Sequence, residues 1–314
     1  MALEQTRLTE KASLAVLMLS YNEAIHLPRC LDHIEGFAQQ VFLVDSGSTD
    51  RTVEIAQSRG VHVLHHPFQN YARQFQWGLD HAPITTDWVM RLDPDEIIEP
   101  DLAEEIVREL PRLPASVTGV VLNRKTVFQG KFLRHGGRYP LLLLRIWRRD
   151  KARIEDRWMD EHMLLSEGSS VTFRGGFADY NLNDLTFFTE KHNQYASREA
   201  LDVLNQRMRL FPAAPDARTA TTSRQATWKR FLKESVYNRL PVEVSASLFF
   251  LYRYVFQLGF LDGRRGLTYH LLQGFWYRFL VGAKLRELEE AAARAQTPEQ
   301  LRAELSRLTR RELD

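Results

Sequence analysis

Residues 88–96 read Trp-Val-Met-Arg-Leu-Asp-Pro-Asp-Glu, an apolar run that ends in three carboxylates. We expect a buried strand that stops at Pro94, which has no N–H for a strand ladder, and that delivers Asp93, Asp95 and Glu96 into a cleft. Crowded carboxylates repel one another, and Mg²⁺ or Mn²⁺, which prefer carboxylate oxygens, would relieve that repulsion. The alternative is a solvated acidic turn that opens the next helix.

Short apolar runs alternate with helical spacing upstream of this stretch. Such alternation predicts an open α/β sheet with right-handed crossovers, and continuous apolar strands are typical of a parallel sheet that is buried on both faces. We expect strands at 14–19, 41–44, 61–64 and 88–92, and helices at 24–34, between 50 and 60, and at 71–81. Ligands of such sheets bind at the carboxyl ends of the strands, where the polar segments 20–23, 45–50 and 93–96 all fall.

These three segments carry a family resemblance. Leu19-Ser20-Tyr21-Asn22-Glu23, then Val44-Asp45-Ser46-Gly47-Ser48-Thr49-Asp50, then Leu92-Asp93-Pro94-Asp95-Glu96 resemble the successive signatures of family 2 glycosyltransferases, over about the first half of the chain. The resemblance implies the GT-A fold, a Rossmann-like and mostly parallel sheet flanked by helices. It also implies an inverting, metal-dependent hexosyl transfer from a nucleotide-diphosphate sugar. The later part resembles bacterial enzymes that build lipopolysaccharide core and exopolysaccharide, which implies a saccharide or lipid-linked saccharide acceptor.

The resemblance also implies roles for single residues. Donor contacts are expected around the nucleotide base from Ser20, Tyr21, Asn22, Glu23, Asp45, Ser46 and Gly47. Asp93 would approach the ribose or the metal, and Asp95, the second acid of the D-x-D motif, would ligate the Mg²⁺ or Mn²⁺ that bridges the diphosphate. The alternative for Asp45 is an Asx turn or a helix cap.

One departure from the family pattern lies before Gly78. Many relatives have an arginine and an asparagine where this chain has Phe75 and Gln76. Arg73 and Gln74, just upstream, are therefore the candidates for diphosphate contacts, and the alternative for Arg73 is a solvated helix arginine.

The segment 158–163, Trp-Met-Asp-Glu-His-Met, places two acids and an imidazole among apolar residues. An inverting transfer needs a carboxylate that takes the proton of the acceptor hydroxyl, and partial burial would raise a carboxylate pKa toward the working range. The family likeness favours Glu161 as this base and Asp160 as second choice, with His162 as a weaker acceptor contact. A structural ion pair with nearby arginines is the alternative, and zinc is disfavoured because no His-Glu-x-x-His spacing occurs.

The remaining segments predict a second, helical part. We expect a polar loop or an acceptor-lining segment at 123–139, with His135, Arg138 and Tyr139 as candidate contacts, and a hinge at 211–222. Further predicted elements are a helix at 102–110, strands at 117–122 and 141–147, a loop at 179–184 and a helix at 189–205. The domain prediction is a tail at 1–12, a GT-A catalytic domain at 13–185, a helical extension at 186–284 and a charged helix at 285–314.

Aromatic-rich helices with basic flanks occupy residues 228–284 and suit docking on an anionic membrane surface. Arg253 and Gln257 form a polar stripe on the first of them. The alternative is a helical cap whose apolar faces cover the sheet or each other.

Composition narrows the function classes. The 314 residues carry a net charge of +2, so a nucleic-acid partner is disfavoured. The single cysteine, Cys30, rules out an intramolecular disulfide and fits a reducing compartment. The N-terminus lacks the apolar core of a secretory signal. Together with the resemblance to bacterial lipopolysaccharide enzymes and the basic, apolar segment 228–284, these features give the expected location, which is cytoplasmic and peripheral on the inner face of a bacterial inner membrane.

Two other functions fit part of the pattern. One is a catalytically silent protein that binds sugar nucleotides or acts as a scaffold at the membrane. The other is a nucleotidyltransferase of the same fold, which is disfavoured because Ser20–Ala24 stands where its glycine-rich phosphate loop would be.

Overall fold

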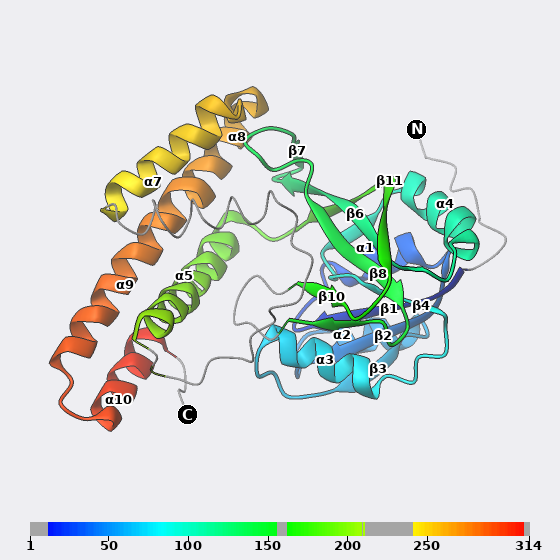
Figure 1. The fold of residues 1–314 in the computed structure, drawn as a ribbon, viewed down its shortest axis with the longest axis horizontal. Coiled ribbons are helices and arrows are strands. Elements are labelled where there is room, and N and C mark those ends of the chain that lie inside the picture. Colours follow the sequence, from blue (N-terminus) through cyan, green and yellow to red (C-terminus); the bar gives the residue numbers. More distant parts are fainter. Residues whose placement is uncertain (1–11, 156–161, 209, 211–240, 311–314) are drawn as a thin grey trace. The chain divides into compact units, whose positions relative to one another are not determined.

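The computed structural model describes residues 12–155, 162–208, 210 and 241–310 (Figure 1). The chain divides into a sheet unit, Met1–Arg134 with Arg138–Leu182, and a helical unit, His135–Gly137 with Asn183–Asp314. The helical unit thus includes three residues from the middle of the chain. Both C-terminal segments that the sequence separates, 186–284 and 285–314, belong to it.

The sheet unit is built on a mixed sheet whose N-terminal part is parallel (Figure 1). Along the sheet, β3 (His62–His65), β2 (Ala38–Asp45), β1 (Ala12–Ser20) and β4 (Trp88–Arg91) are neighbours and parallel. The order continues through β8 (Leu142–Arg148), β6 (Val117–Phe128), β11 (Ser169–Tyr180) and β5 (Glu96–Ile98), with β7 (Lys131–Leu133) on β6. The predicted parallel strands are confirmed, whereas β8, β5 and β7 pair antiparallel and make the rest of the sheet mixed.

Helices cover both faces of the parallel strands because the strand residues are apolar on both faces. On one face, Leu14, Val16 and Met18 of β1 pack with α1 (Leu27–Ile34) and α4 (Pro100–Glu109). On the other face, Ala15 and Leu17 pack with α3 (Tyr71–His81). The short helices α2 (Thr52–Ser58) and η1 (Leu110–Arg112) complete the connections.

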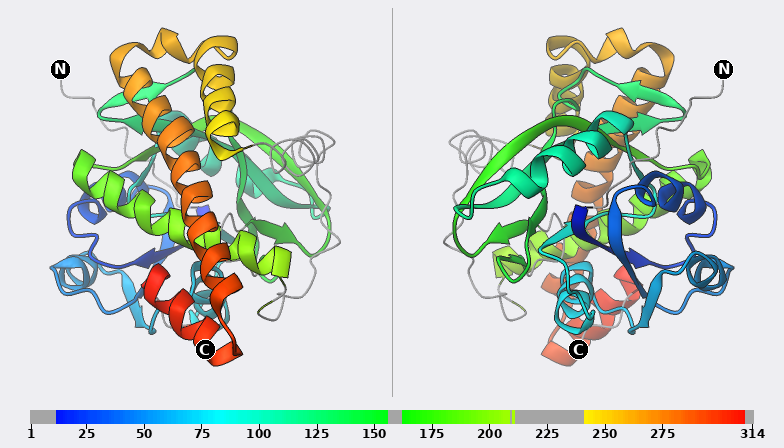
Figure 2. Two further views of the ribbon diagram at one scale, coloured as in Figure 1. Left: turned by 90° about the vertical axis from the view of Figure 1, so that its left-hand side faces the viewer. Right: turned by 90° about the vertical axis from the view of Figure 1, so that its right-hand side faces the viewer.

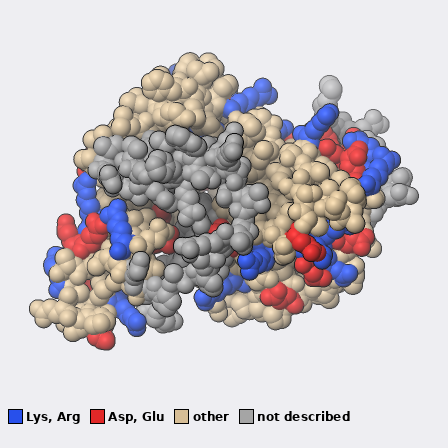
Figure 3. Space-filling view, viewed as in Figure 1, with Lys and Arg blue, Asp and Glu red and all other residues tan. Residues whose placement is uncertain are grey.

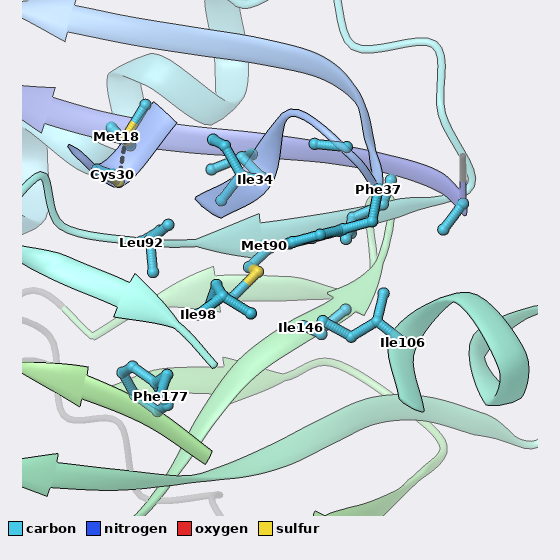
Figure 4. Packing of buried hydrophobic residues seen from close by; sticks show 14 of the residues in the cluster. Met18, Cys30, Ile34, Phe37, Met90, Leu92, Ile98, Ile106, Ile146 and Phe177 are labelled. Carbon is cyan, nitrogen blue, oxygen red and sulfur yellow. Dashed lines mark hydrogen bonds between the residues drawn. The ribbon is translucent and has the colours of Figure 1, made fainter. Parts of the chain in front are cut away.

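Figure 4 shows part of the first of these two cores. Cys30 points from α1 toward the sheet, is fully buried, and its Sγ lies 3.8 Å from Sδ of Met18. Met90 and Leu92 of the β4 region, Ile98 of β5 and Phe177 of β11 extend the same core. The segment after β4 is therefore fixed by apolar residues on either side of its acids.

Two sequence predictions need correction. The segment 123–139 is not a loop, because β6 continues to Phe128 and returns through β7. Strand β11 was not expected at all, since Gly175 and Gly176 interrupt its apolar pattern. A Cβ on Gly175 would lie 2.5 Å from Cα of Leu102, so glycine is required where α4 approaches this strand. A two-stranded sheet of β9 (Ala152–Ile154) and β10 (Met163–Leu165) flanks the segment 156–161.

The helical unit is held by an apolar contact between α5 (Leu185–Met208) and α9 (Tyr277–Arg294), which lie side by side in Figures 1 and 2. Ala200, Leu201 and Leu204 of α5 meet Leu285 and Leu288 of α9, and Leu305 of α10 (Pro298–Thr309) joins them. Its remaining described elements are α7 (Val242–Leu251), η3 (Tyr252–Phe256), η4 (Gly259–Asp262), α8 (Gly263–Tyr269) and η5 (His270–Trp276). The predicted hinge at 211–222 lies outside the described residues.

Among the described helices, none has by itself the length and apolar composition that crossing a bilayer requires. The helical segments Val242–Phe256 and Gly259–Arg294 meet the criterion only as a pair, and the chain bends by 71° between them. On the face of the molecule in Figure 3, basic side chains lie among acidic ones.

Candidate active site

The loops after β1 and β2 are hydrogen-bonded to each other at the carboxyl edge of the sheet. Asn22, whose φ is 57°, donates its backbone N–H to Ser48 Oγ at 2.9 Å and accepts the Thr49 N–H on its Oδ1 at 2.8 Å. The Glu23 N–H is donated to Thr52 Oγ1 at 2.7 Å. Asn22 therefore ties the first predicted motif to the second, and Tyr21 next to it stays exposed.

Asp45 ends β2 and is only 1% exposed. Its Oδ1 accepts hydrogen bonds from the hydroxyls of Ser20, at 2.9 Å, and Ser48, at 2.5 Å. Its Oδ2 accepts the N–H groups of Gly47 and Ser48, both at 2.9 Å. Burial would raise the pKa of Asp45, but these donors outweigh it and hold the pKa below its ordinary value.

The bonds of Asp45 form the Asx turn that was the alternative interpretation of this residue. Gly47, at a φ of +91°, closes the turn in a conformation that favours glycine. Contact between Asp45 and a nucleotide base stays a prediction, and it would require the exchange of one of these four bonds.

Helix α3 presents Gln74 inward and Arg73 outward. The fully buried amide of Gln74 donates to Ser46 Oγ at 3.1 Å and to His66 O at 2.9 Å, so it joins the ends of β2 and β3. Arg73 is exposed, and its Nη1 lies 3.5 Å from Oε1 of Gln69 on the same side of the helix. A diphosphate contact of Arg73 stays a prediction, and Gln74 is a scaffold residue for the Ser46 loop.

Asp93 follows β4 and is surrounded by cationic and hydroxyl groups. Its Oδ1 accepts a hydrogen bond from the Tyr71 hydroxyl at 2.5 Å, and its Oδ2 lies 3.8 Å from Arg145 Nη1. Arg91 stacks on Tyr71, with its guanidinium carbon 4.4 Å from the ring centroid. Burial opposes ionisation, but Arg91, Arg145 and Tyr71 hold the pKa of Asp93 below its ordinary value.

Glu96 faces the protein interior and fixes the acidic loop, residues 93–96, through two hydrogen bonds. It is almost fully buried, accepts a hydrogen bond from Arg145 Nη2 at 2.7 Å, and accepts the Asp93 N–H at 2.9 Å. Burial raises the pKa of Glu96 to about 8, against the opposing effect of Arg145. The expectation that Glu96 enters a cleft with the two aspartates is wrong, because its side chain positions the loop instead.

Asp95 is the acid of this loop with the fewest protein contacts in the described structure. Its Oδ2 accepts a hydrogen bond from Asn181 Nδ2 at 3.0 Å, and its carbonyl accepts the Tyr180 N–H at 3.0 Å. Tyr180 at the end of β11 and the adjacent Asn181 thus hold the loop. The other carboxylate oxygen of Asp95 makes no hydrogen bond within the described part of the chain.

This donor set fits a divalent cation that is completed by a substrate. No group of three His, Cys, Asp or Glu side chains in the described ranges could hold a metal ion alone. Mg²⁺, however, usually takes one or two carboxylates from a protein and its other ligands from water and phosphate oxygens. Asp95 fits that role, whereas Asp93 is already engaged by Tyr71 and two arginines.

The predicted catalytic acids cannot be placed, because Asp160 and Glu161 lie outside the described residues. His162 is described and exposed, and its Nδ1 lies 3.7 Å from Oε2 of Glu155. The Glu155 N–H donates to the His162 carbonyl at 2.9 Å, which brings the two ends of segment 156–161 together.

Three of the four weak acceptor candidates, His135, Arg138 and Tyr139, are divided between the two units. Arg138 Nη2 donates to Thr126 Oγ1 at 3.2 Å, and the Tyr139 ring packs edge-on against Phe132, both within the sheet unit. His135 belongs to the helical unit, where its Nδ1 lies 2.9 Å from Asp262 Oδ1. An acceptor role for any of them stays a prediction.

Sequence reasoning missed four residues that shape the site: Tyr71, Arg91, Arg145 and Asn181. Two of them carry a signal that was available. Arg91 and Arg145 each stand alone inside an apolar strand, and a lone charge in a buried strand indicates a buried ion pair. Tyr71 and Asn181 carry no such signal, because only the folded chain brings them to the acidic loop.

Comparison with known proteins identifies the family. The family model described as glycosyl transferase family 2 matches residues 15–180, more than half of the chain. An uncharacterized glycosyltransferase of Rickettsia bellii is 34% identical over 99 residues, which is 32% of each chain. The lipopolysaccharide core biosynthesis glycosyltransferase LpsC of Rhizobium meliloti is 26% identical over 171 residues, 53% of this chain and 62% of the relative. The chain thus spans about a third of the length of the Rickettsia relative that it matches.

Among solved structures, TarS 1-349 of S. aureus, crystallised with UDP-GlcNAc, aligns with a TM-score of 0.43 and 12% identity over 88% of this chain and 92% of that one. The matched residues 15–180 contain all three strand-end motifs, the third of which is the acidic loop. The chain therefore belongs to glycosyl transferase family 2 and has its GT-A fold.

Proposed function

We propose that this chain is an inverting glycosyltransferase that moves a sugar from a nucleotide-diphosphate sugar to a hydroxyl of a saccharide or lipid-linked saccharide acceptor. The observation that carries the proposal is the gathering of three motifs at one sheet edge, where β2, β1 and β4 are adjacent and parallel. The same arrangement would let the Ser20–Glu23 and Asp45–Asp50 loops hold a nucleoside while the acidic loop meets its diphosphate.

In this proposal Asp95 is the main metal ligand, and Asp93, whose carboxylate is held in place by its neighbours, is the second. When bound, Mg²⁺ or Mn²⁺ would neutralise the charge that develops on the diphosphate leaving group. Tyr71 and Arg145 hold the Asp93 carboxylate in place, and Glu96 holds its backbone. The acidic loop is thus preorganised by its own chain, which is the condition for strong electrostatic catalysis.

Glu161 is proposed as the general base, with Asp160 as second choice. The base would take the proton of the acceptor hydroxyl as that oxygen attacks the anomeric carbon. Both acids stand in the chain between β9 and β10, strands that pair with each other.

The acceptor is proposed to belong to cell-surface glycan synthesis, as part of a lipopolysaccharide core or an exopolysaccharide. The core glycosyltransferase LpsC among the relatives supports this class. The proposed location is the cytoplasmic face of a bacterial inner membrane, where a lipid-linked acceptor would be held.

The test is a screen of uridine and guanosine diphosphate sugars for metal-dependent release of the nucleoside diphosphate. We expect one donor to turn over with Mg²⁺ or Mn²⁺, and Asp95→Asn to lower that rate by about 10² to 10³. Asp87→Asn, an exposed acid just before the opposite end of β4, is the matched control and should keep the rate.

If a donor binds but is not turned over, with or without metal, the chain is a sugar-nucleotide-binding scaffold and the enzyme proposal is wrong. Equal rates for Asp95→Asn and the unmodified chain would move the metal role to another residue.

A further inference from the structure

The helical unit carries an exposed apolar stripe along α7 and η3. Leu248, Leu251, Tyr252, Val255 and Phe256 recur at i, i+3, i+4, i+7 and i+8, which is the spacing of one helix face. All five side chains are exposed, and Phe256 is 77% exposed. In a globular protein such a face usually packs on the core, whereas here it faces solvent.

The turn that follows continues the same surface. Leu258, Phe260 and Leu261 are exposed around η4, at the 71° bend between the two helical segments. We call the stripe and these three residues together the apolar apex. Large contiguous apolar surfaces of this kind mark contact sites for a protein or a membrane.

Polar groups occupy the interior of this region. Arg253, 5% exposed, donates from Nε to the Gly136 carbonyl at 2.7 Å and from Nη1 to Gln273 Oε1 at 2.6 Å. Asp262, 3% exposed, accepts the N–H of His135 and lies within 2.9 Å of its ring Nδ1. Because turning the helix over would break these buried bonds, the apolar residues are fixed on the outside.

The backbone at Gly136 also packs closely against Gln257 and His270 in the same interior. Gly136 has a φ of +67° and donates its N–H to the Gln257 carbonyl at 2.8 Å. A Cβ at Gly136 would lie 2.1 Å from Cε1 of His270, so the segment fits only as glycine. The outward-facing apolar surface therefore belongs to a defined structure.

The exposed charge of this region is purely positive. From Val244 to Leu271 the only carboxylate is Asp262, which is buried, while Arg264 and Arg265 are exposed directly after the apex. Two copies of the chain that met through this surface would bring these like charges together. An anionic lipid surface would instead neutralise them and cover the apolar side chains.

We propose that the apolar apex inserts into the interface of a bilayer that contains anionic lipid, with Arg264 and Arg265 at the headgroups. Phe256, Phe260 and Leu261 would lie among the upper acyl chains, and Tyr252 has the ring type found at headgroup depth. This inference rests on the membrane location in the proposed function and names the surface that makes the contact.

Flotation with vesicles tests the proposal on the full chain. We expect the chain to float with vesicles of phosphatidylglycerol and phosphatidylethanolamine. Phe256→Ser with Phe260→Ser should weaken binding at least tenfold, since each buried ring contributes strongly to insertion. Phe68→Ser with Phe187→Ser removes two exposed phenylalanines outside the apex and should bind as the unmodified chain does.

A second variant measures the electrostatic contribution to vesicle binding separately from that of the apolar side chains, and it changes no buried residue that the fold needs. Arg264→Ala with Arg265→Ala alters only exposed side chains and should weaken binding to anionic vesicles by about fivefold per charge. Its affinity for vesicles of phosphatidylcholine alone should not change, and added salt should erase its difference from the unmodified chain.

Three results would overturn the proposal: no flotation of the unmodified chain, equal flotation of the Phe256/Phe260 variant, or a dimer by light scattering that this variant converts to monomers without any vesicle binding. Release of the nucleoside diphosphate into water requires no membrane. A chain that turns over donor but ignores vesicles would therefore disprove this inference and leave the enzyme proposal standing.

Discussion

The two units expose opposite kinds of side chain at the places that matter for function. In the sheet unit, apolar strands fill most of the interior, and Asp93 and Asp95 lie at the sheet edge above the buried Glu96. At the apolar apex of the helical unit, leucine and phenylalanine face outward while Arg253 and Asp262 are inside. The sheet unit is organised to hold charge at its surface edge, and the apex is organised to present apolar surface.

Among the described residues, each unit also buries one arginine almost completely, and the partners of these two arginines differ. Arg145 faces the carboxylates of Glu96 and Asp93, whereas Arg253 faces the amide oxygens of Gly136 and Gln273. A buried arginine beside carboxylates fixes charged groups for chemistry. A buried arginine beside backbone and amide oxygens fixes the shape of a chain segment.

The largest expected effect follows from the chemistry assigned to the sheet unit. Glu161→Gln should lower transfer to the acceptor by about 10² to 10⁴, since general base catalysis contributes that much. Donor and metal binding should stay near normal, because the base acts on the acceptor. Steady-state transfer rates and calorimetric donor binding measure the two effects separately.

Asp160→Asn is the matched control in the same segment and should lose less. If Asp160→Asn is the more damaging change, Asp160 is the base, and the pH dependence of transfer should follow it.

The second prediction compares the two arginines directly. Arg145→Met should lower the free energy of unfolding by about 3 to 5 kcal/mol at pH 9, because it removes the nearest cation from the buried Glu96 carboxylate and a cation from half-buried Asp93. Arg253→Met should cost less, about 1.5 to 3 kcal/mol, because the hydrogen-bond partners described for it, the Gly136 carbonyl and the Gln273 amide oxygen, are neutral. Urea unfolding of each variant gives the values, with exposed Arg51→Met as the control that changes little.

The comparison is made at pH 9, above the pKa of about 8 of Glu96, so that this carboxylate is ionised. Equal costs at the two arginines under these conditions would contradict this account.

The smallest effect concerns acid stability. The pKa of folded Asp45 is held below its ordinary value, so its contribution to stability is present above about pH 4 and is lost as the pH falls through the folded pKa. Ser20→Ala removes one donor to this carboxylate and should cost about 1 kcal/mol at neutral pH. The acid limb of a pH–stability curve should move to higher pH.

Ser58→Ala, an exposed hydroxyl on α2, should leave that limb in place. An unchanged limb in Ser20→Ala would mean that Gly47 and Ser48 alone set the pKa of Asp45.

Much of the parallel half of the sheet was predictable because its strands are apolar on both faces. Helix α3 has the predicted bounds, Tyr71–His81, and its Asn70 cap accepts the Arg73 N–H. Helix α1 begins three residues later than expected, at Leu27, and Pro28 lies in its first turn. These elements depend on local signals, which a sequence contains in full.

The remaining part depends on contacts between distant segments. Strand β6 carries Arg124 and Lys125 beyond the predicted end at Leu122, because Arg124 lies near Glu96 and Lys125 pairs with Glu99. From the sequence alone, a segment with such polar residues is interpreted as a loop, because their distant partners are not apparent. From basic flanks and aromatic-rich helices, the sequence left residues 228–284 as either membrane-docking or a helical cap, and the buried bonds of Arg253 are what distinguish the outward face of the apex.

The lone cysteine has a practical consequence. Cys30 is shielded between α1 and β1, and burial raises the pKa of its thiol well above the ordinary value. A thiol reagent therefore has no reactive site on the native chain, and a cysteine introduced at an exposed position such as Phe256 would be labelled alone. Fluorescence at that single position would report its surroundings in solution and in the presence of vesicles, without prior removal of the native cysteine.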